Sequence, residues 1–341
     1  MVDSRSAGTA RILDVQWGFL KLDQLLRGAP FHAPADVERA VFATVAHRAM
    51  RPRSAAGIAE WASRDVAIPR VSRLSGESLG EARRLLTDPD FRIAIEAAVL
   101  EPLRGLIRAM VCLSTIADPA PPPGAAGQRF AMAVTDCGVP LRLWTWPAGT
   151  RPSTYRVQAA AFVAQEEFGR LARIRAGSPG VAAGLGDEPR RANDRFGVDR
   201  LELRTLPEQK AGERRLVVKF DEPAGMTEHL LHVTDPGLDL ADVARGYAAA
   251  EETARDLADL VAGSRPSTGV PGRDGGFPLT SWLALLLIRL TEYDAELPWA
   301  AVRTDLDRLH QVLLSDGTHS VARDTPLTDL QRRLLRDDEG R

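Results

Sequence analysis

The chain has 341 residues, a hydrophobic content of 44% and a formal net charge of −2 at pH 7. This composition suffices for two or three packed units. The chain lacks the basic excess that is typical of nucleic-acid-binding proteins, which counts against tight, nonspecific binding of nucleic acids. The two cysteines, Cys112 and Cys137, have no zinc-ligand or disulfide spacing, so we expect a cytoplasmic protein. The most apolar run, Trp282–Leu290, is too short to cross a membrane and predicts a buried helix.

The first 110 residues are expected to form a helical domain. Apolar residues at helical spacing predict a helix over Val15–Leu26, ended by Gly28. Pro34 begins a second helix, and Pro52 ends it. Further helices are expected after Ser54, which would cap the first of them, and over Leu79–Leu86 and Phe91–Met110.

The middle of the chain begins with strand patterns. Val111–Leu113 is a short strand-like run, and a linker rich in Pro, Gly and Ala follows it. Two longer runs, Phe130–Thr135 and Val139–Trp146, flank an Asp-Cys-Gly sequence, which is typical of a tight hairpin. Because side chains alternate along a strand, Trp144 and Trp146 are expected on the same side.

Beyond the hairpin, helix and strand patterns alternate. Gln158–Ala176 predicts a helix, and Gly177–Asn193 predicts a loop. His229 and His232 lie three residues apart in a strand pattern, so they would point to opposite faces and could not share a metal ion. Residues 236–341 are expected to be helical. The strands predicted between the loop and this helical part are Val198–Leu206, Arg214–Phe220 and Glu228–Val233.

The hairpin string AVTDCGVPLRLWTWPAGT, residues 133–150, resembles the strand pair of DDE-type insertion-sequence transposases. Val41–Pro69 is similar to an N-terminal segment of the same branch, with His47 replacing Asn and Ala55 replacing Lys. Asp235–Tyr247 resembles the start of that family's last core helix. Within Val41–Pro69, Arg48 and Trp61 would either face DNA or brace a small helical bundle.

The resemblance implies an RNase H-like core. The fold expected is α+β, mainly helical, with a truncated RNase H-like mixed sheet and a small β-rich insertion at about 196–235. Three parts are expected: a helical N-terminal domain over 1–110, the core remnant over 111–262, and a C-terminal helical part over 263–341 that packs on the core.

In the family, three acidic residues hold two divalent cations that drive phosphodiester transfer. The resemblance puts Ser114 at the first acidic position and Ala254 at the third. The second acidic position lies in deleted sequence, between residues 151 and 195. No metal or cofactor is therefore expected, and Mg²⁺ would be required if other acids took over. The substitutes considered are Asp118, Asp136, Glu251 and Glu252.

Two interpretations of the last core helix stay open. Glu251, Arg255 and Asp259 recur at four-residue spacing and would form a surface stripe of ion pairs. Alternatively, a shift of two or three residues would bring Glu251 or Glu252 to the acidic position.

The functional hypotheses are a catalytically inactive transposase remnant, a regulator that binds DNA or oligomerises with itself or an active relative, a helical remnant without a role, and an active transposase with misplaced acids. No membrane partner is expected. The arginines proposed to contact DNA are Arg48, Arg142, Arg245 and Arg255.

Overall fold

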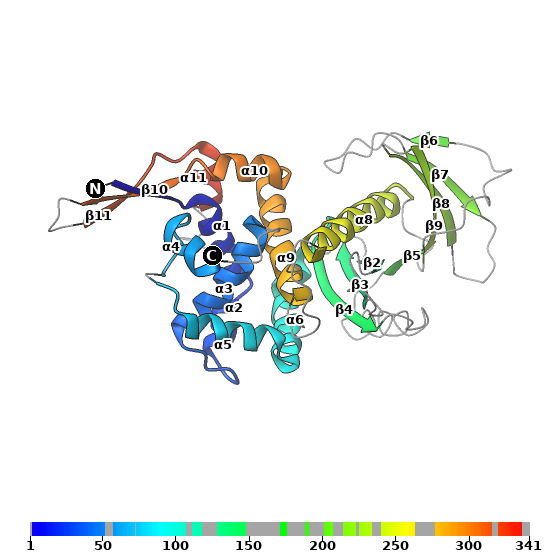
Figure 1. Cartoon of the computed structure of the whole chain (residues 1–341). Helices are drawn as coiled ribbons and strands as arrows, with labels where there is room; N and C mark the ends of the chain where they lie inside the picture. Colours follow the sequence, from blue (N-terminus) through cyan, green and yellow to red (C-terminus); the bar gives the residue numbers. More distant parts are fainter. Residues whose placement is uncertain are drawn as a thin grey trace. The chain divides into compact units, whose positions relative to one another are not determined.

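The chain divides into two compact units. Unit 1 comprises Met1–Pro102 together with Asp259–Arg341, and unit 2 comprises Leu103–Ala258. This grouping differs from the expected C-terminal part packed on the core, because the C-terminal helices share a unit with the N-terminal ones. The computed structural model (Figure 1) describes residues 2–51, 57–71, 73–106, 111–117, 128–147, 171–175, 188–190, 201–206, 214–222, 225–233, 240–262, 277–315 and 320–335.

The N-terminal half of unit 1 is mainly helical, as predicted. The helix expected over Val15–Leu26 is broken at Lys21, which has a φ of 55°. The break lets both Leu20 and Leu22 be fully buried, whereas residues two apart on a continuous helix face different sides. The helices are α1 (Gly8–Phe19), α2 (Leu22–Arg27), α3 (Ala35–Met50), α4 (Ile58–Arg64), α5 (Gly76–Thr87) and α6 (Pro89–Leu103). The 3₁₀ turn that follows, η1 (Arg104–Leu106), belongs to unit 2.

The N-cap of α4 corrects one prediction. Gly57, not Ser54, is the N-cap, and its φ of 84° lies in the left-handed region that glycine adopts readily. Ser54 itself lies outside the described residues. A serine close to a helix start was a reasonable expectation, but the chain turns into the helix three residues later.

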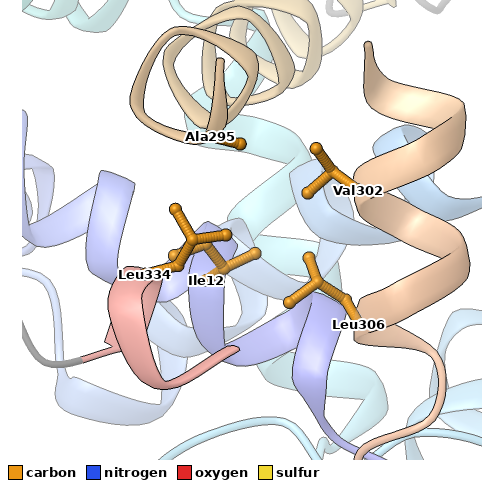
Figure 2. Packing of buried hydrophobic residues seen from close by; sticks show 5 residues of the cluster. All are labelled: Ile12, Ala295, Val302, Leu306 and Leu334. Atoms are coloured by element: carbon orange, nitrogen blue, oxygen red, sulfur yellow. The ribbon is translucent and has the colours of Figure 1, made fainter. Parts of the chain in front are cut away.

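Three C-terminal helices complete the core of unit 1. They are α9 (Phe277–Ala295), α10 (Trp299–Leu306) and α11 (Asp329–Leu335). Figure 2 shows one cluster in which side chains from α1, α9, α10 and α11 point toward one another. All five are at most 4% exposed, so helices from both ends of the chain share one apolar core. The cluster consists of Ile12, Ala295, Val302, Leu306 and Leu334.

A three-stranded antiparallel sheet joins the two ends of the chain. It has the order β1-β10-β11, with β1 at Val2–Ser6, β10 at His310–Ser315 and β11 at Ser320–Asp324. The expectations of helix throughout 1–110 and 236–341 were wrong at these strands. Val2–Ser6 is polar and carries no strand pattern, so its structure depends on pairing with β10, which local sequence does not reveal.

The described residues of unit 2 form a mixed sheet of eight strands. Their order is β4-β3-β2-β5-β9-β8-β7-β6, and neighbours are antiparallel except β2 and β5, which run parallel. The hairpin and the β-rich segment thus belong to the same sheet (Figure 1). The strands are β2 (Val111–Ala117), β3 (Gln128–Thr135), β4 (Pro140–Pro147), β5 (Leu171–Arg175), β6 (Glu188–Arg190), β7 (Leu201–Leu206), β8 (Arg214–Glu222) and β9 (Gly225–Val233).

Two predictions around this sheet were wrong. Leu171–Arg175 is strand β5 and not the end of a helix, and β6 lies within the predicted loop. Because β5 fills the position between β2 and β9, tertiary pairing has overridden a pattern that also suited a helix. The other residues of Gln158–Ala176 and of Gly177–Asn193 lie outside the described ranges. The α+β class is confirmed, and α8 (Leu240–Ala262) follows the sheet.

Candidate functional site

The β3–β4 hairpin has the tight turn that its sequence predicts. The Gly138 amide donates to the Thr135 carbonyl at 3.0 Å, and the Thr135 amide donates to the Val139 carbonyl at 2.9 Å. The Val139 amide also donates to Thr135 Oγ1 at 3.0 Å. Gly138 has a φ of 85°, which a residue with a Cβ adopts only with strain. The turn is therefore fixed by both backbone and side-chain bonds.

The two indoles of β4 lie on the same side of the strand, as expected, and they stack. The Trp144 and Trp146 rings are 6.3 Å apart and only 10° from parallel. The Arg142 guanidinium lies 5.4 Å from the Trp144 ring centroid, within range of a cation–π contact. Arg142 is half-buried, so this proposed DNA contact already takes part in the packing of its own strand.

Ser114, which the resemblance puts at the first acidic position, lies inside the sheet. Ser114 of β2 is in register with Met132 of β3, and the next residue back, Leu113, is in register with Arg173 of β5. A strand with neighbours on both sides is well suited to hold a catalytic carboxylate, but serine supplies only a hydroxyl. The substitute Asp118 lies outside the described residues.

A strand, β5, lies within the range in which the sequence was expected to be deleted. β5 runs parallel to β2, so the carboxyl ends of both strands lie toward the same edge of the sheet. The five residues of β5 are Leu-Ala-Arg-Ile-Arg and include no acid. The sequence predicted no strand here, because these residues lie at the end of a helix pattern and include no acid.

Ala254, which the resemblance puts at the third acidic position, lies on α8 beside a bond that joins the helix to the hairpin. Thr253 Oγ1 is 2.9 Å from the Gly138 carbonyl and 2.7 Å from the Ala249 carbonyl of its own helix. The adjacent Ala254 is 5% exposed, and a methyl group cannot bind a metal ion. Glu251 lies one turn earlier and is half-buried.

The remaining acidic substitutes do not form a cluster with these positions. Asp136 is half-buried in the hairpin turn, and Glu252 is half-buried on α8. Among the residues that the structure describes, no three His, Cys, Asp or Glu side chains gather closely enough to hold a metal ion.

The N-terminal segment that resembles the family is mostly interior. Arg48 is 6% exposed and Trp61 is 4% exposed, and burial lowers the pKa of Arg48. Arg51 forms an exposed ion pair with Asp65 at 2.9 Å. These positions favour the alternative in which the segment braces a helical bundle over one in which Arg48 meets DNA directly.

His47 illustrates the same bracing. Its ring is 4.8 Å from the Trp61 ring in an edge-to-face arrangement, and the residue is 3% exposed. Burial first, and then the charges of Arg48 and Arg51, lower the pKa of His47 to about 4. The imidazole is therefore neutral at pH 7.

The other proposed DNA contacts are at the surface of α8. Arg245 and Arg255 are both exposed. Arg245 forms an ion pair with Asp242, one turn before it. Of the four arginines proposed to contact DNA, these two present their side chains to solvent most fully.

A buried charge network in unit 1 was not predicted. Glu38 and Arg39 are 2% and 4% exposed, and Arg39 Nε donates to Glu38 Oε2 at 2.7 Å. Trp17 Nε1 donates to Glu38 Oε1 at 2.8 Å, and Asp14 accepts from Arg39 at 2.6 Å. Asp14 also accepts from Arg70 at 2.8 Å. The network links α1, α3 and the segment after α4.

This network explains the charge state of its central arginine. Burial lowers the pKa of Arg39, but the hydrogen bonds and charges of Glu38 and Asp14 outweigh that effect and raise it. The guanidinium also lies 4.7 Å from the Phe42 ring centroid. In sequence, a Glu-Arg pair on a helix suggests a solvated face, so only the packing reveals this role.

No model of a protein family matches the chain, and no curated protein matches it either. Within the ranges that the structure describes, no helix combines the length and hydropathy that a membrane span requires.

Proposed function

We propose that the chain is a catalytically silent relative of DDE-type insertion-sequence transposases, with an RNase H-like core. The observation that carries the proposal is the bond between Thr253 and the Gly138 carbonyl. It joins the helix that resembles the family's last core helix to the hairpin that resembles its strand pair. Two segments more than 100 residues apart in sequence, each with its own resemblance, thus meet in unit 2.

The mixed sheet supports the same descent. Its β2 strand pairs antiparallel with β3 and parallel with β5, and each of the three corresponds to an element that the resemblance requires. The family's chemistry needs carboxylates from separate elements, because two hard cations must be held by oxygen ligands around one phosphodiester. Ser114, the acid-free β5 and Ala254 occupy the corresponding places. The proposed protein therefore keeps the scaffold and lacks the cation ligands.

Manganese binding tests the assignment of these positions. We expect no Mn²⁺ binding and no DNA strand cutting by the natural chain. The double variant Ser114→Asp with Ala254→Glu should gain Mn²⁺ affinity, measured by calorimetry, if the two positions converge. Ser114→Asn with Ala254→Gln is the matched control, since it has nearly the same shape without the charge.

Two outcomes would refute the proposal. Metal-dependent strand cutting by the natural chain, abolished by replacing one acid such as Glu251, would make it an active enzyme. Equal Mn²⁺ binding by the acidic and amide variants would mean that the two positions do not form a cation site.

A second candidate function is regulation of a related active transposase through DNA binding. Exposed Arg255 on α8 favours it. If Arg255 contacts a phosphate, Arg255→Ala should reduce the slope of log affinity against log salt by about 0.9. Arg84→Ala, at another exposed helix position, is the control. Affinity that is weak and independent of salt would remove this candidate.

A further inference from the structure

Two large apolar side chains are exposed side by side on the small sheet of unit 1. Leu314 is 43% exposed and Val321 is 53% exposed. They stand directly opposite each other on β10 and β11. Ala322, Arg323 and Asp324 of β11 are exposed as well. Figure 1 shows the β10–β11 hairpin projecting from the helices of this unit.

β11 also has an open backbone edge. β10 lies between β1 and β11, and among the described residues β11 pairs with β10 alone. The Thr325 amide donates to the His310 carbonyl at 2.9 Å. Because bonded pairs alternate along an antiparallel ladder, the backbone groups of Val321 and Arg323 point toward β10. Those of Ser320, Ala322 and Asp324 therefore point outward.

The outward groups are complementary to a second copy of the same strand. A two-fold axis through Ala322 pairs Ala322 with itself and Ser320 with Asp324 of the other copy. Every outward amide then meets an outward carbonyl, as an antiparallel ladder requires. A strand that can pair with itself in this way forms a closed, symmetric contact and not an open fibre.

Side-chain charges favour this register. The register with its axis at Ala322 sets Arg323 of one copy opposite Val321 of the other, and Asp324 opposite Ser320. No like charges therefore face each other. Moving the axis to Arg323 would oppose two arginines, which is unfavourable. The Asp324 carboxylate is already neutralised within its own chain, because Arg11 donates to its two oxygens at 2.5 and 2.7 Å.

We propose that two copies of this chain associate edge to edge through antiparallel β11 strands. The two three-stranded sheets become one sheet of six strands. Val321 and Leu314 from both copies lie on the same side, where Arg323 of each copy covers Val321 of the other. The contact shields the exposed apolar pair and uses the open edge, which is otherwise a template for uncontrolled pairing. The inference does not depend on descent from a transposase.

Sedimentation velocity on the full chain tests the contact. We expect the mass to rise with concentration from the 37.0 kDa of one chain toward twice that value. Ala322→Pro removes an outward amide, which an edge strand tolerates, and should raise the dimer dissociation constant by roughly tenfold or more. Ala322→Val keeps that amide and should leave the constant nearly unchanged.

A charge-exchange pair tests the register without altering the backbone. Val321→Arg sets like charges opposite each other at both symmetric positions and should weaken the dimer. Adding Arg323→Glu turns these into opposite charges and should restore it. A monomer at every concentration, or a dimer that Ala322→Pro does not weaken, would overturn the proposal. Failure of Arg323→Glu to restore association would overturn the register.

Discussion

At His47, burial controls both charge and stability. The folded chain holds the pKa of His47 at about 4 through burial and the charges of Arg48 and Arg51, whereas an unfolded histidine has a pKa of about 6.5. Between these values the unfolded chain binds a proton that the folded chain does not. Stability from neutral His47 is therefore complete above about pH 6.5 and falls as the pH drops toward 4.

The expected loss over this interval is about 3 kcal/mol in the free energy of unfolding. Urea unfolding of the natural chain and of His47→Gln, measured between about pH 7 and pH 4, should reveal it. Relative to that of His47→Gln, the free energy of unfolding of the natural chain should fall by that amount as the pH drops. A difference that does not change with pH would mean that the pKa of His47 is the same in the folded and the unfolded chain.

Replacing the buried carboxylate of Glu38 should lower the free energy of unfolding more than replacing an exposed carboxylate. Glu38→Gln leaves the buried charge of Arg39 with one of its two carboxylate partners, Asp14. We expect the free energy of unfolding to fall by about 3 kcal/mol. Glu60→Gln, which breaks the exposed pair with Arg64, should cost less than about 0.5 kcal/mol. Chemical denaturation of both variants tests the contrast. Equal losses would show that the buried network adds no more than a surface pair.

At the scale of elements, the bond from Thr253 to Gly138 should hold the hairpin turn against α8. Thr253→Val removes it while keeping the side chain's shape, and a lost buried bond is worth about 1 kcal/mol. Hydrogen exchange of the turn amides at residues 136–139 should become faster. Thr291→Val is the control, because Thr291 is also fully buried and bonds a carbonyl one turn back in its own helix at 2.8 Å. Unchanged hydrogen exchange in Thr253→Val would show that the bond from Thr253 to Gly138 does not stabilise the hairpin turn.

The elements that sequence predicted well were those with strong local signals. The hairpin has its turn glycine and alternating strands, α3 has proline at its start, and α9 has an uninterrupted apolar run. Among the missed elements, β1 and β5 are set by their neighbours: polar Val2–Ser6 is a strand because β10 pairs with it, and β5 because β2 and β9 flank it. For the candidate site, the resemblance only proposes that Ser114 and Ala254 stand at two acidic positions. Local sequence could not reveal that β5 pairs with β2 or that Arg48 is buried, because both depend on tertiary packing.

At the scale of the molecule, unit 1 needs both ends of the chain. The faces of α1 that meet Leu306 and Leu334 have no partners in the first 110 residues alone. We expect a fragment over 1–110 to melt without a cooperative transition by circular dichroism, and a fragment over 277–335 to restore one when added. A sharp transition of the first fragment alone would contradict the shared core.

The same division has a consequence for synthesis on the ribosome. Helices α1 to α6 emerge early, but β10 and α11 that complete their core come more than 200 residues later. At roughly 5–20 residues per second, the nascent N-terminal segment waits on the order of ten seconds or more with its apolar surface uncovered. A premature stop codon anywhere in unit 2 would therefore also leave unit 1 without the helices that complete its core. Nascent-chain chaperones should bind this protein throughout translation of its middle third.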